Sequence, residues 1–249
     1  MRMTRALGAC ALLLLYAAPS VAASKAVPSL LAGMQSTPGP GELSPYVKLL
    51  VELSLLSFIP TALIAMTSFT RIIITLSFLR HALGMPETPP NPVLLTLALF
   101  LTFFTMAPTL ERCYHEGVEP YLSNKLTTTE GLARSVTPLK GFMLKHIRPQ
   151  DLQSVGELAK MPLPDDVQTV PLQILAPAFM LSELRASFVA GFVIFLPFLL
   201  IDLIVAAVLM ALGMMMVPPV TISLPLKVML FVLIDGWSLL MRAIAGAYT

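Results

Sequence analysis

Charged side chains inside apolar runs are the residues of this sequence that could do chemistry. Asp202 lies in one such run, Lys227 and Asp235 lie in the next, and Glu183 and Arg185 stand at the entrance to the first. An ionisable group at the centre of a bilayer costs about 3 kcal/mol to insert, so it usually has a charged partner or faces a water-filled path. These five residues are the candidate assembly or intramembrane charges.

Three interpretations of these charges compete. They could form ion pairs that hold helices or neighbouring subunits together, they could line a translocation path, or they could relay protons or catalyse a reaction. Lys227 and Asp235 are eight positions apart, so a continuous helix would place them on one face. An intramembrane aspartyl enzyme would use Asp202 and Asp235, but Asp235-Gly236 is not embedded in that family's motif.

Motifs of known enzyme classes are absent from the sequence. It contains no HExxH, Walker, GxGxxG or GxSxG pattern, and its histidines are scattered without metal-ligand spacing. We therefore expect no catalytic residue, no metal ion and no cofactor. Only Cys113 remains if the segment containing Cys10 is removed, so an intrachain disulfide is not expected.

A second candidate site is a methionine-rich turn between two long apolar runs, 186–212 and 220–241. The turn is Gly213-Met214-Met215-Met216-Val217-Pro218-Pro219, in which the glycine relaxes the backbone and the two prolines cannot continue a helix. Thioether side chains are apolar and flexible, so they adapt to whatever they contact. The alternative is that the methionines simply face lipid. We interpret the tip of this helical hairpin as a deformable apolar seal.

The elements that must position these residues belong to a membrane protein. The 249-residue chain is 56% hydrophobic and only 12% charged, about half the charged fraction of a soluble domain. Sixteen basic and fourteen acidic residues give a formal charge of +2, so the composition does not indicate nucleic-acid binding. The predicted fold class is an all-α integral membrane protein with about four hydrophobic segments in kinked hairpins.

The N-terminal end has the pattern of a cleavable signal peptide, residues 1–23. A basic start with Arg2 and Arg5 precedes a short apolar stretch and the small residues Ala22 and Ala23. Its removal would leave fourteen basic residues against fourteen acidic ones. Residues 24–45 form a Pro-, Gly- and Ser-rich linker that we expect to be exported.

The first helical hairpin is predicted at 46–107. Its first span, 46–66, contains Pro60, which should kink it. Residues 67–84 have Arg71 and Arg80 around an apolar centre and a helix stop at Gly84, and two arginines in a short connection indicate the cytoplasmic side. A proline-rich turn follows at 85–92. The second apolar run, 93–106, is predicted to end at Pro108.

A polar extramembrane segment is predicted at 108–185, with helical or mixed structure. It contains eight basic and nine acidic residues over 109–185. Long loops cross the membrane largely regardless of charge, so this composition agrees with an extracytoplasmic location. The second hairpin, 186–249, follows, and Pro197 should interrupt its first arm. Counting the predicted spans in order places the methionine-rich tip on the cytoplasmic side.

The sequence resembles the FliP/SctR family of type III secretion export-gate proteins over nearly the whole chain after the signal. The resemblance rests on SFTRIIITLSFLRHALG (68–84), PPNPVLLTLALFLTFFTM (89–106), FMLSELRASFVAGFVIFLPFLLIDL (179–203), GMMMVPPVTISLP (213–225) and LFVLIDGW (230–237). These stretches are far more specific than any single short motif. The signal peptide favours the flagellar branch of the family over the virulence branch.

The resemblance implies a role for the candidate residues. Met214, Met215 and Met216 would form a gasket around an export channel, while Glu183 and Lys227 would contact neighbouring subunits. It also implies a pentameric homo-oligomer joined by FliQ and FliR, with FlhA and FlhB in the same machine. The implied location is the flagellar basal body in the bacterial inner membrane, in contact with lipid, and the implied cargo is unfolded flagellar export substrates.

The resulting hypothesis is a pore-forming subunit of a protein export gate without catalysis of its own. Two alternatives stay open at this stage: an intramembrane aspartyl enzyme, and a scaffold that nucleates a membrane assembly without lining its path.

Overall fold

The computed structural model describes residues 64–161, 164, 166, 169–214 and 216–248, together with isolated positions between 47 and 61. The chain divides into two compact units, 1–61 and 62–249, and the elements below belong to the second. The predicted signal peptide, the linker and most of the first span lie outside the described residues. So does Met215. The described residues contain helices and no strand, as an all-α fold requires.

Helix α3 (Phe69–Ala82) is the central helix of this unit. Ile72, Leu76 and Leu79 share one face at helical spacing, and all three are buried against α4 and α8. The helix ends as predicted at Gly84, whose positive φ of 78° allows its N–H to bond the carbonyl of His81. The segment predicted as a short connection is therefore a buried core helix.

Helix α4 (Asn91–Cys113) continues through Pro108, where the sequence predicted its end. The proline removes one N–H donor, but Met106 and Thr109 beside it are buried, and this packing keeps the helix continuous. The helix passes into a π-helical segment, η1 (Tyr114–Val118), and then into α5 (Glu119–Leu122). The predicted boundary at 107/108 thus lies inside a helix.

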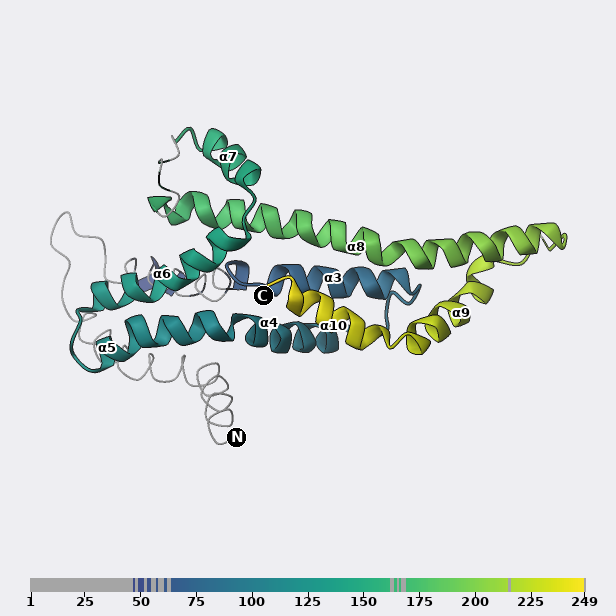
Figure 1. Cartoon of the computed structure of the whole chain (residues 1–249), viewed down its shortest axis with the longest axis horizontal. Helices are drawn as coiled ribbons and strands as arrows, with labels where there is room; N and C mark the ends of the chain where they lie inside the picture. The colour runs from purple at the N-terminus through teal and green to yellow at the C-terminus, as the bar shows by residue number, and fades with distance from the viewer. Residues whose placement is uncertain are drawn as a thin grey trace. The chain divides into compact units, whose positions relative to one another are not determined.

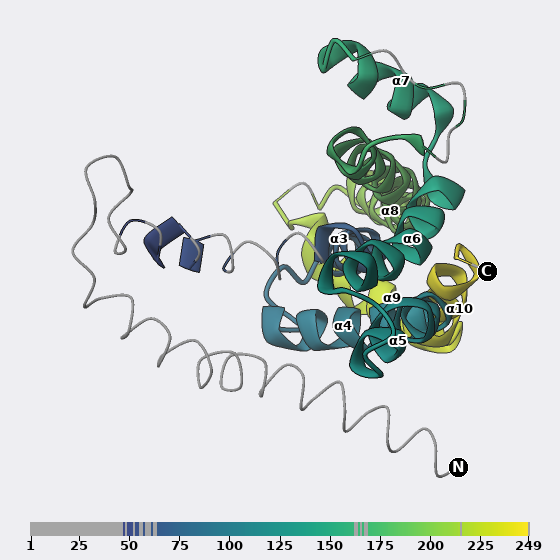
Figure 2. The same ribbon diagram turned by 90° about the vertical axis from the view of Figure 1, so that its left-hand side faces the viewer.

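Two amphipathic helices follow, α6 (Thr128–His146) and α7 (Pro149–Leu158). Helix α6 begins with a capping box, in which the Thr127 side chain accepts from the Glu130 N–H and the Glu130 carboxylate accepts from the Thr127 N–H. Helix α7 packs on α8 at the edge of the unit, as the end-on view shows (Figure 2). The polar segment is thus helical in its described part.

Helix α8 (Leu172–Ala211) is a single element of 40 residues (Figure 1). It begins well before residue 186, and Pro197 does not interrupt it, contrary to the prediction. Phe198 is buried next to that proline and contacts the core, which compensates for the lost hydrogen bond. Helix α8 and α3 approach closely at Gly191, where a Cβ would lie 2.5 Å from the Phe78 ring.

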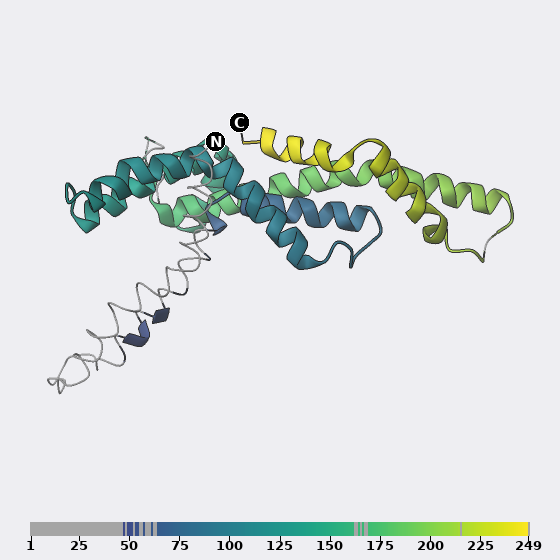
Figure 3. The same cartoon turned by 90° about the horizontal axis from the view of Figure 1, so that it is seen from below.

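The last apolar run forms two helices instead of one. Helix α9 (Pro219–Leu233) and α10 (Gly236–Gly246) are bent by 65° at Asp235, which adopts a left-handed conformation with φ 50°. Figure 3 shows the bend from below. Lys227 and Asp235 therefore do not share the face of one continuous helix, which corrects the prediction.

Two of the helical segments are long and apolar enough to cross a membrane, Asn91–Leu122 and Leu172–Ala211. The bent pair Pro219–Leu233 and Gly236–Gly246 becomes a third candidate if it counts as one broken span. The described part of the chain is thus an α-helical membrane-type fold with two or three candidate spans.

Candidate functional site

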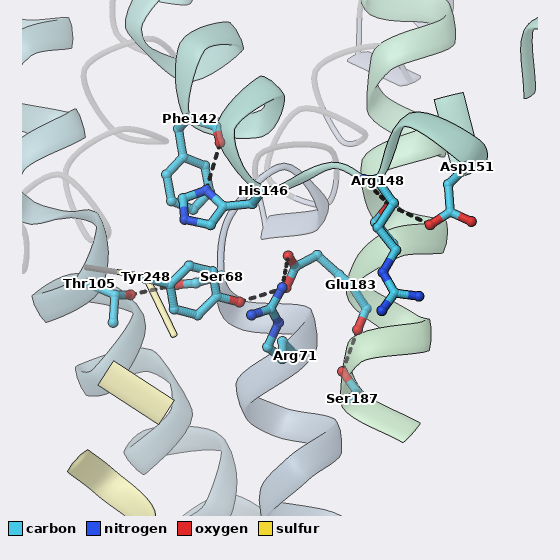
Figure 4. Close-up of polar contacts among 11 residues, drawn as sticks. Ser68, Arg71, Thr105, Phe142, His146, Arg148, Asp151, Glu183, Ser187 and Tyr248 are labelled. Carbon is cyan, nitrogen blue, oxygen red and sulfur yellow. Dashed lines mark hydrogen bonds and ion pairs between the residues drawn. The ribbon is translucent and has the colours of Figure 1, made fainter. Parts of the chain in front are cut away.

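A buried ion pair joins α3 to α8. The Arg71 guanidinium donates to Glu183 Oε1 at 2.6 Å, and the Glu183 side chain is completely buried. The second carboxylate oxygen, Oε2, accepts a hydrogen bond of 2.6 Å from the hydroxyl of Tyr248. Figure 4 shows these three side chains converging from α3, α8 and the C-terminal end of the chain. Both oxygens of the carboxylate therefore have donors within the chain.

Aromatic rings surround this ion pair. The Arg71 guanidinium lies 4.6 Å from the centre of the Tyr248 ring, a cation–π distance. The same ring stacks on Phe142 and lies close to His146, whose Nδ1 is 2.8 Å from the Phe142 carbonyl (Figure 4). Burial raises the pKa of Tyr248, and the charge of Glu183 raises it further, so the hydroxyl stays protonated and donates.

A second polar cluster fastens α7 to α8. Asp151 is almost completely buried, accepts a hydrogen bond from the Ser182 hydroxyl at 2.7 Å, and lies 3.2 Å from the Arg185 guanidinium. The Ser182 hydroxyl also accepts from the backbone N–H of Arg148. Arg185, a predicted site residue, therefore pairs within its own chain.

A third ion pair lies in the hairpin of α8 and α9. The Lys227 ammonium donates to Asp202 Oδ2 at 2.7 Å, with the lysine side chain buried and the aspartate 36% exposed. The pair corresponds to the first of the three interpretations, ion pairs between helices. Glu183 and Lys227 each have a hydrogen-bonded partner within this chain. Their predicted contact with another subunit stays a prediction.

Asp235 lies apart from these pairs. It is exposed at the bend, its backbone carbonyl accepts from the Leu239 N–H, and its left-handed backbone conformation is uncommon outside glycine, asparagine and aspartate. Asp202 is bonded to Lys227, and among the described residues no group of three or more His, Cys, Asp or Glu could hold a metal ion.

The methionine-rich tip connects α8 to α9 at the far end of the hairpin (Figure 1). Gly213 has a φ of 73°, and the Met214 N–H bonds back to the Leu209 carbonyl, so the glycine ends α8 in a left-handed turn. Pro218 and Pro219 begin α9, where missing N–H donors cost nothing. Met216 is 97% exposed and Met214 is 43% exposed. The tip therefore presents thioethers that its own chain does not cover.

Comparison with known proteins decides the family. The model of the FliP family matches residues 52–244, which is more than half of the chain. The chain belongs to the FliP family. A flagellar biosynthetic protein FliP from Pectobacterium carotovorum subsp. carotovorum is 50% identical over 94% of this chain and 90% of its own length.

Two further FliP relatives have similar sequence identities to this chain. The Bacillus subtilis protein is 48% identical over 86% of this chain and 96% of its own length. The protein from Buchnera aphidicola subsp. Acyrthosiphon pisum is 52% identical over 81% of this chain, which spans 53% of that relative. The names of these relatives are those of flagellar biosynthesis proteins and not of enzymes. Membership of the FliP family, with its apolar helices, assigns this chain to flagellum biogenesis at a membrane.

Sequence reasoning missed three members of the site. Arg71 is predicted only as a positive charge in a short connection between spans, because its spacing does not show that it reaches Glu183 on α8. Asp151 and Tyr248 gave no signal, because a lone aspartate in a polar segment and a tyrosine near a chain end are usually exposed. Their partners are far away in the sequence and could not be identified from spacing.

Proposed function

We propose that this FliP-family chain is a pore-forming core subunit of the flagellar type III protein export gate in the bacterial inner membrane. It would pass unfolded flagellar proteins, as a homo-oligomer with FliQ and FliR, and together with FlhA and FlhB. The chain would have no catalytic residue and no cofactor of its own. Its export-gate role rests on family membership and on the chemistry of the tip.

The observation that supports this proposal best is the exposed methionine tip at the end of a long apolar hairpin. Met216 is 97% exposed, although burial of such a side chain would gain about 2 kcal/mol. Several uncovered apolar side chains together at a turn favour contact with a partner, a lipid or a passing chain. Flexible thioethers fit a passing chain of varying shape better than branched side chains do. A ring of such tips would close a pore by excluding water when it is idle.

The charged residues favour this function over an intramembrane enzyme. A general acid–base pair of aspartates needs two carboxylates that share a site. Here Asp202 bonds Lys227 instead, and Asp235 stands exposed at a helix bend. An Asp235→Asn variant that assembles and still supports flagellum formation would contradict the enzyme hypothesis directly.

Site-specific crosslinking tests the proposal. A photoreactive amino acid at Met216 should capture an export substrate that is stalled during secretion, because the tip would line its path. The matched control is the same amino acid at Leu158, which is 83% exposed on α7. Capture at Met216 and not at Leu158 is the expected result. Equal capture at both positions, or none at Met216 in an active complex, would contradict the pore-forming role and favour the scaffold.

A further inference from the structure

The end of the chain is held by helices to which it does not belong. Tyr248 follows α10 by two residues, and its side chain is inserted between α3, α6 and α8 (Figure 4). Its hydroxyl donates to Glu183, its ring lies against Arg71, and it stacks on Phe142. A carboxylate, a cation and an aromatic ring thus hold a single side chain.

This side chain joins two separate parts of the core. The buried residues of α10, Leu240 and Ile244, pack in one apolar cluster with α3 and α4. Tyr248 belongs to the other cluster, which includes Phe142 and Phe179. Tyr248 thus anchors α10 at a second place, in addition to the buried face of the helix itself.

The other end of α10 is strained. Asp235 has φ 50° and ψ 53°, a left-handed conformation that costs free energy for residues with a Cβ, although aspartate tolerates it better than most. Gly236 lies under the Phe231 ring, where a Cβ would come within 2.2 Å of a ring carbon. Relaxing Asp235 into a right-handed conformation would let α9 and α10 continue as one helix. The two helices together are long and apolar enough to cross a membrane, and a 65° bend at a short break separates them.

We propose that Tyr248 is a latch that holds α10 in its bent position, and that its release lets α9 and α10 straighten into one helix. The strain at Asp235 favours the straight form, and the contacts of Tyr248 with Glu183, Arg71 and Phe142 favour the bent form. The hydroxyl is central to the latch because it satisfies Oε2 of a completely buried carboxylate. The latch goes beyond the proposed pore-forming function and does not depend on it.

The distance between spin labels on α9 and α10 tests the latch. Labels are placed at Val220 and Ala243, both exposed, in the full-length protein with Cys10 and Cys113 replaced by serine. A continuous helix between these positions would separate their backbones by about 35 Å, several Å more than the bent pair. The wild-type protein should show the shorter distance alone. Tyr248→Ala should add a longer distance to the distribution. Its population should be at least severalfold greater than any population at that distance in the wild-type protein.

Two further variants distinguish a latch from ordinary packing. Tyr121→Ala removes an exposed tyrosine of α5 and should leave the distance unchanged. Asp235→Gly removes the backbone strain, so the double variant Asp235→Gly with Tyr248→Ala should return most of the population to the shorter distance. If the double variant shows the same population at the longer distance as Tyr248→Ala alone, the role of strain at Asp235 is contradicted.

The outcome does not depend on recovering Tyr248→Ala as a folded protein. Tyr248→Phe keeps the ring and removes only the hydroxyl, and it should show a minor longer component. An unchanged single distance in whichever of the two variants is recovered overturns the proposal. The distance between the labels is measured independently of flagellar export. If the latch proposal fails, the proposed pore-forming function is therefore unaffected.

Discussion

At the scale of single residues, the two charges inside the hairpin of α8 and α9 pair with each other. Lys227 and Asp202 form an ion pair of 2.7 Å between α8 and α9, with the lysine buried. Removing one partner of a buried pair leaves a charge without compensation, which costs much more than the pair itself contributes. The pair therefore fixes the register of the two helices.

Replacing Lys227 by Met should destabilise the hairpin by about 1–3 kcal/mol, below the range for fully buried pairs because Asp202 is partly exposed. The double variant Asp202→Asn with Lys227→Met removes both charges and should recover most of the loss. Thermal unfolding of the purified protein measures each variant. A double variant that is no more stable than the single one would mean that Lys227 has its important partner on another chain.

His146 predicts a pH dependence. Burial lowers its pKa, opposed by its bond to the Phe142 carbonyl, and the charges of Arg71 and Lys145 lower it further. The folded state thus disfavours protonation of this ring. Its full contribution to stability is present above the ordinary pKa of 6.5 and is lost as the pH falls below that value toward the lowered pKa.

Unfolding experiments between pH 7.5 and 5 should show this loss in the wild-type protein and a smaller slope in His146→Gln. The matched control is His81→Gln, since His81 is exposed on α3. Equal pH slopes for His146→Gln and the wild type would assign the effect to other groups.

At the scale of helices, close approach between α3 and α8 depends on Gly191. A Cβ there would lie 2.5 Å from the Phe78 ring, so Gly191→Ala should cost about 2 kcal/mol of stability. Phe78→Leu should restore part of it by making room. Gly141 on α6 is the control, because a Cβ there meets nothing within 4 Å and alanine should stabilise the helix by about 0.5–1 kcal/mol. If Gly191→Ala is as stable as Gly141→Ala, the two helices do not pack as described.

The sequence predicted helices better than it predicted where they end. Apolar periodicity and local turn chemistry identified the stop at Gly84 and the hairpin tip at Gly213, because glycine conformation is a local property. The helix ends predicted at prolines were wrong, since Pro108 and Pro197 both lie inside continuous helices. Buried neighbours compensate for a lost hydrogen bond there, and those neighbours come from distant helices. The bend at Asp235 was missed because the apolar run continues on both sides of it, although an Asp-Gly pair is typical of turns.

The difference between local sequence signals and long-range packing also applies to the candidate site. The charges Glu183, Asp202 and Lys227 were found because any charge in an apolar run is conspicuous. The partners of Glu183, Arg71 and Tyr248, were not found, since these contacts join positions more than sixty residues apart. Ion pairs between helices are a property of packing, and a single sequence does not encode packing locally.

At the scale of the whole molecule, the pattern of residues 1–23 predicts removal of a signal peptide. The mature chain should begin near residue 24 when the protein is made in a bacterium, because the small residues Ala22 and Ala23 follow an apolar stretch. The intact mass of the purified protein decides this. A mass that includes Met1 in the membrane-inserted protein would contradict the prediction.

The central claim is that the methionine tip closes an export pore, and membrane leakage tests it most directly. Changing Met214, Met215 and Met216 together to alanine should widen the closure, so that cells become more permeable to ions and small toxic solutes while the complex still assembles. Motility, complex abundance and leakage are measured in the same strains, with the three methionines changed to isoleucine as a matched apolar control that should keep the seal and slow export. A triple-alanine protein that assembles fully, supports normal motility and leaks no more than the parent would contradict the account.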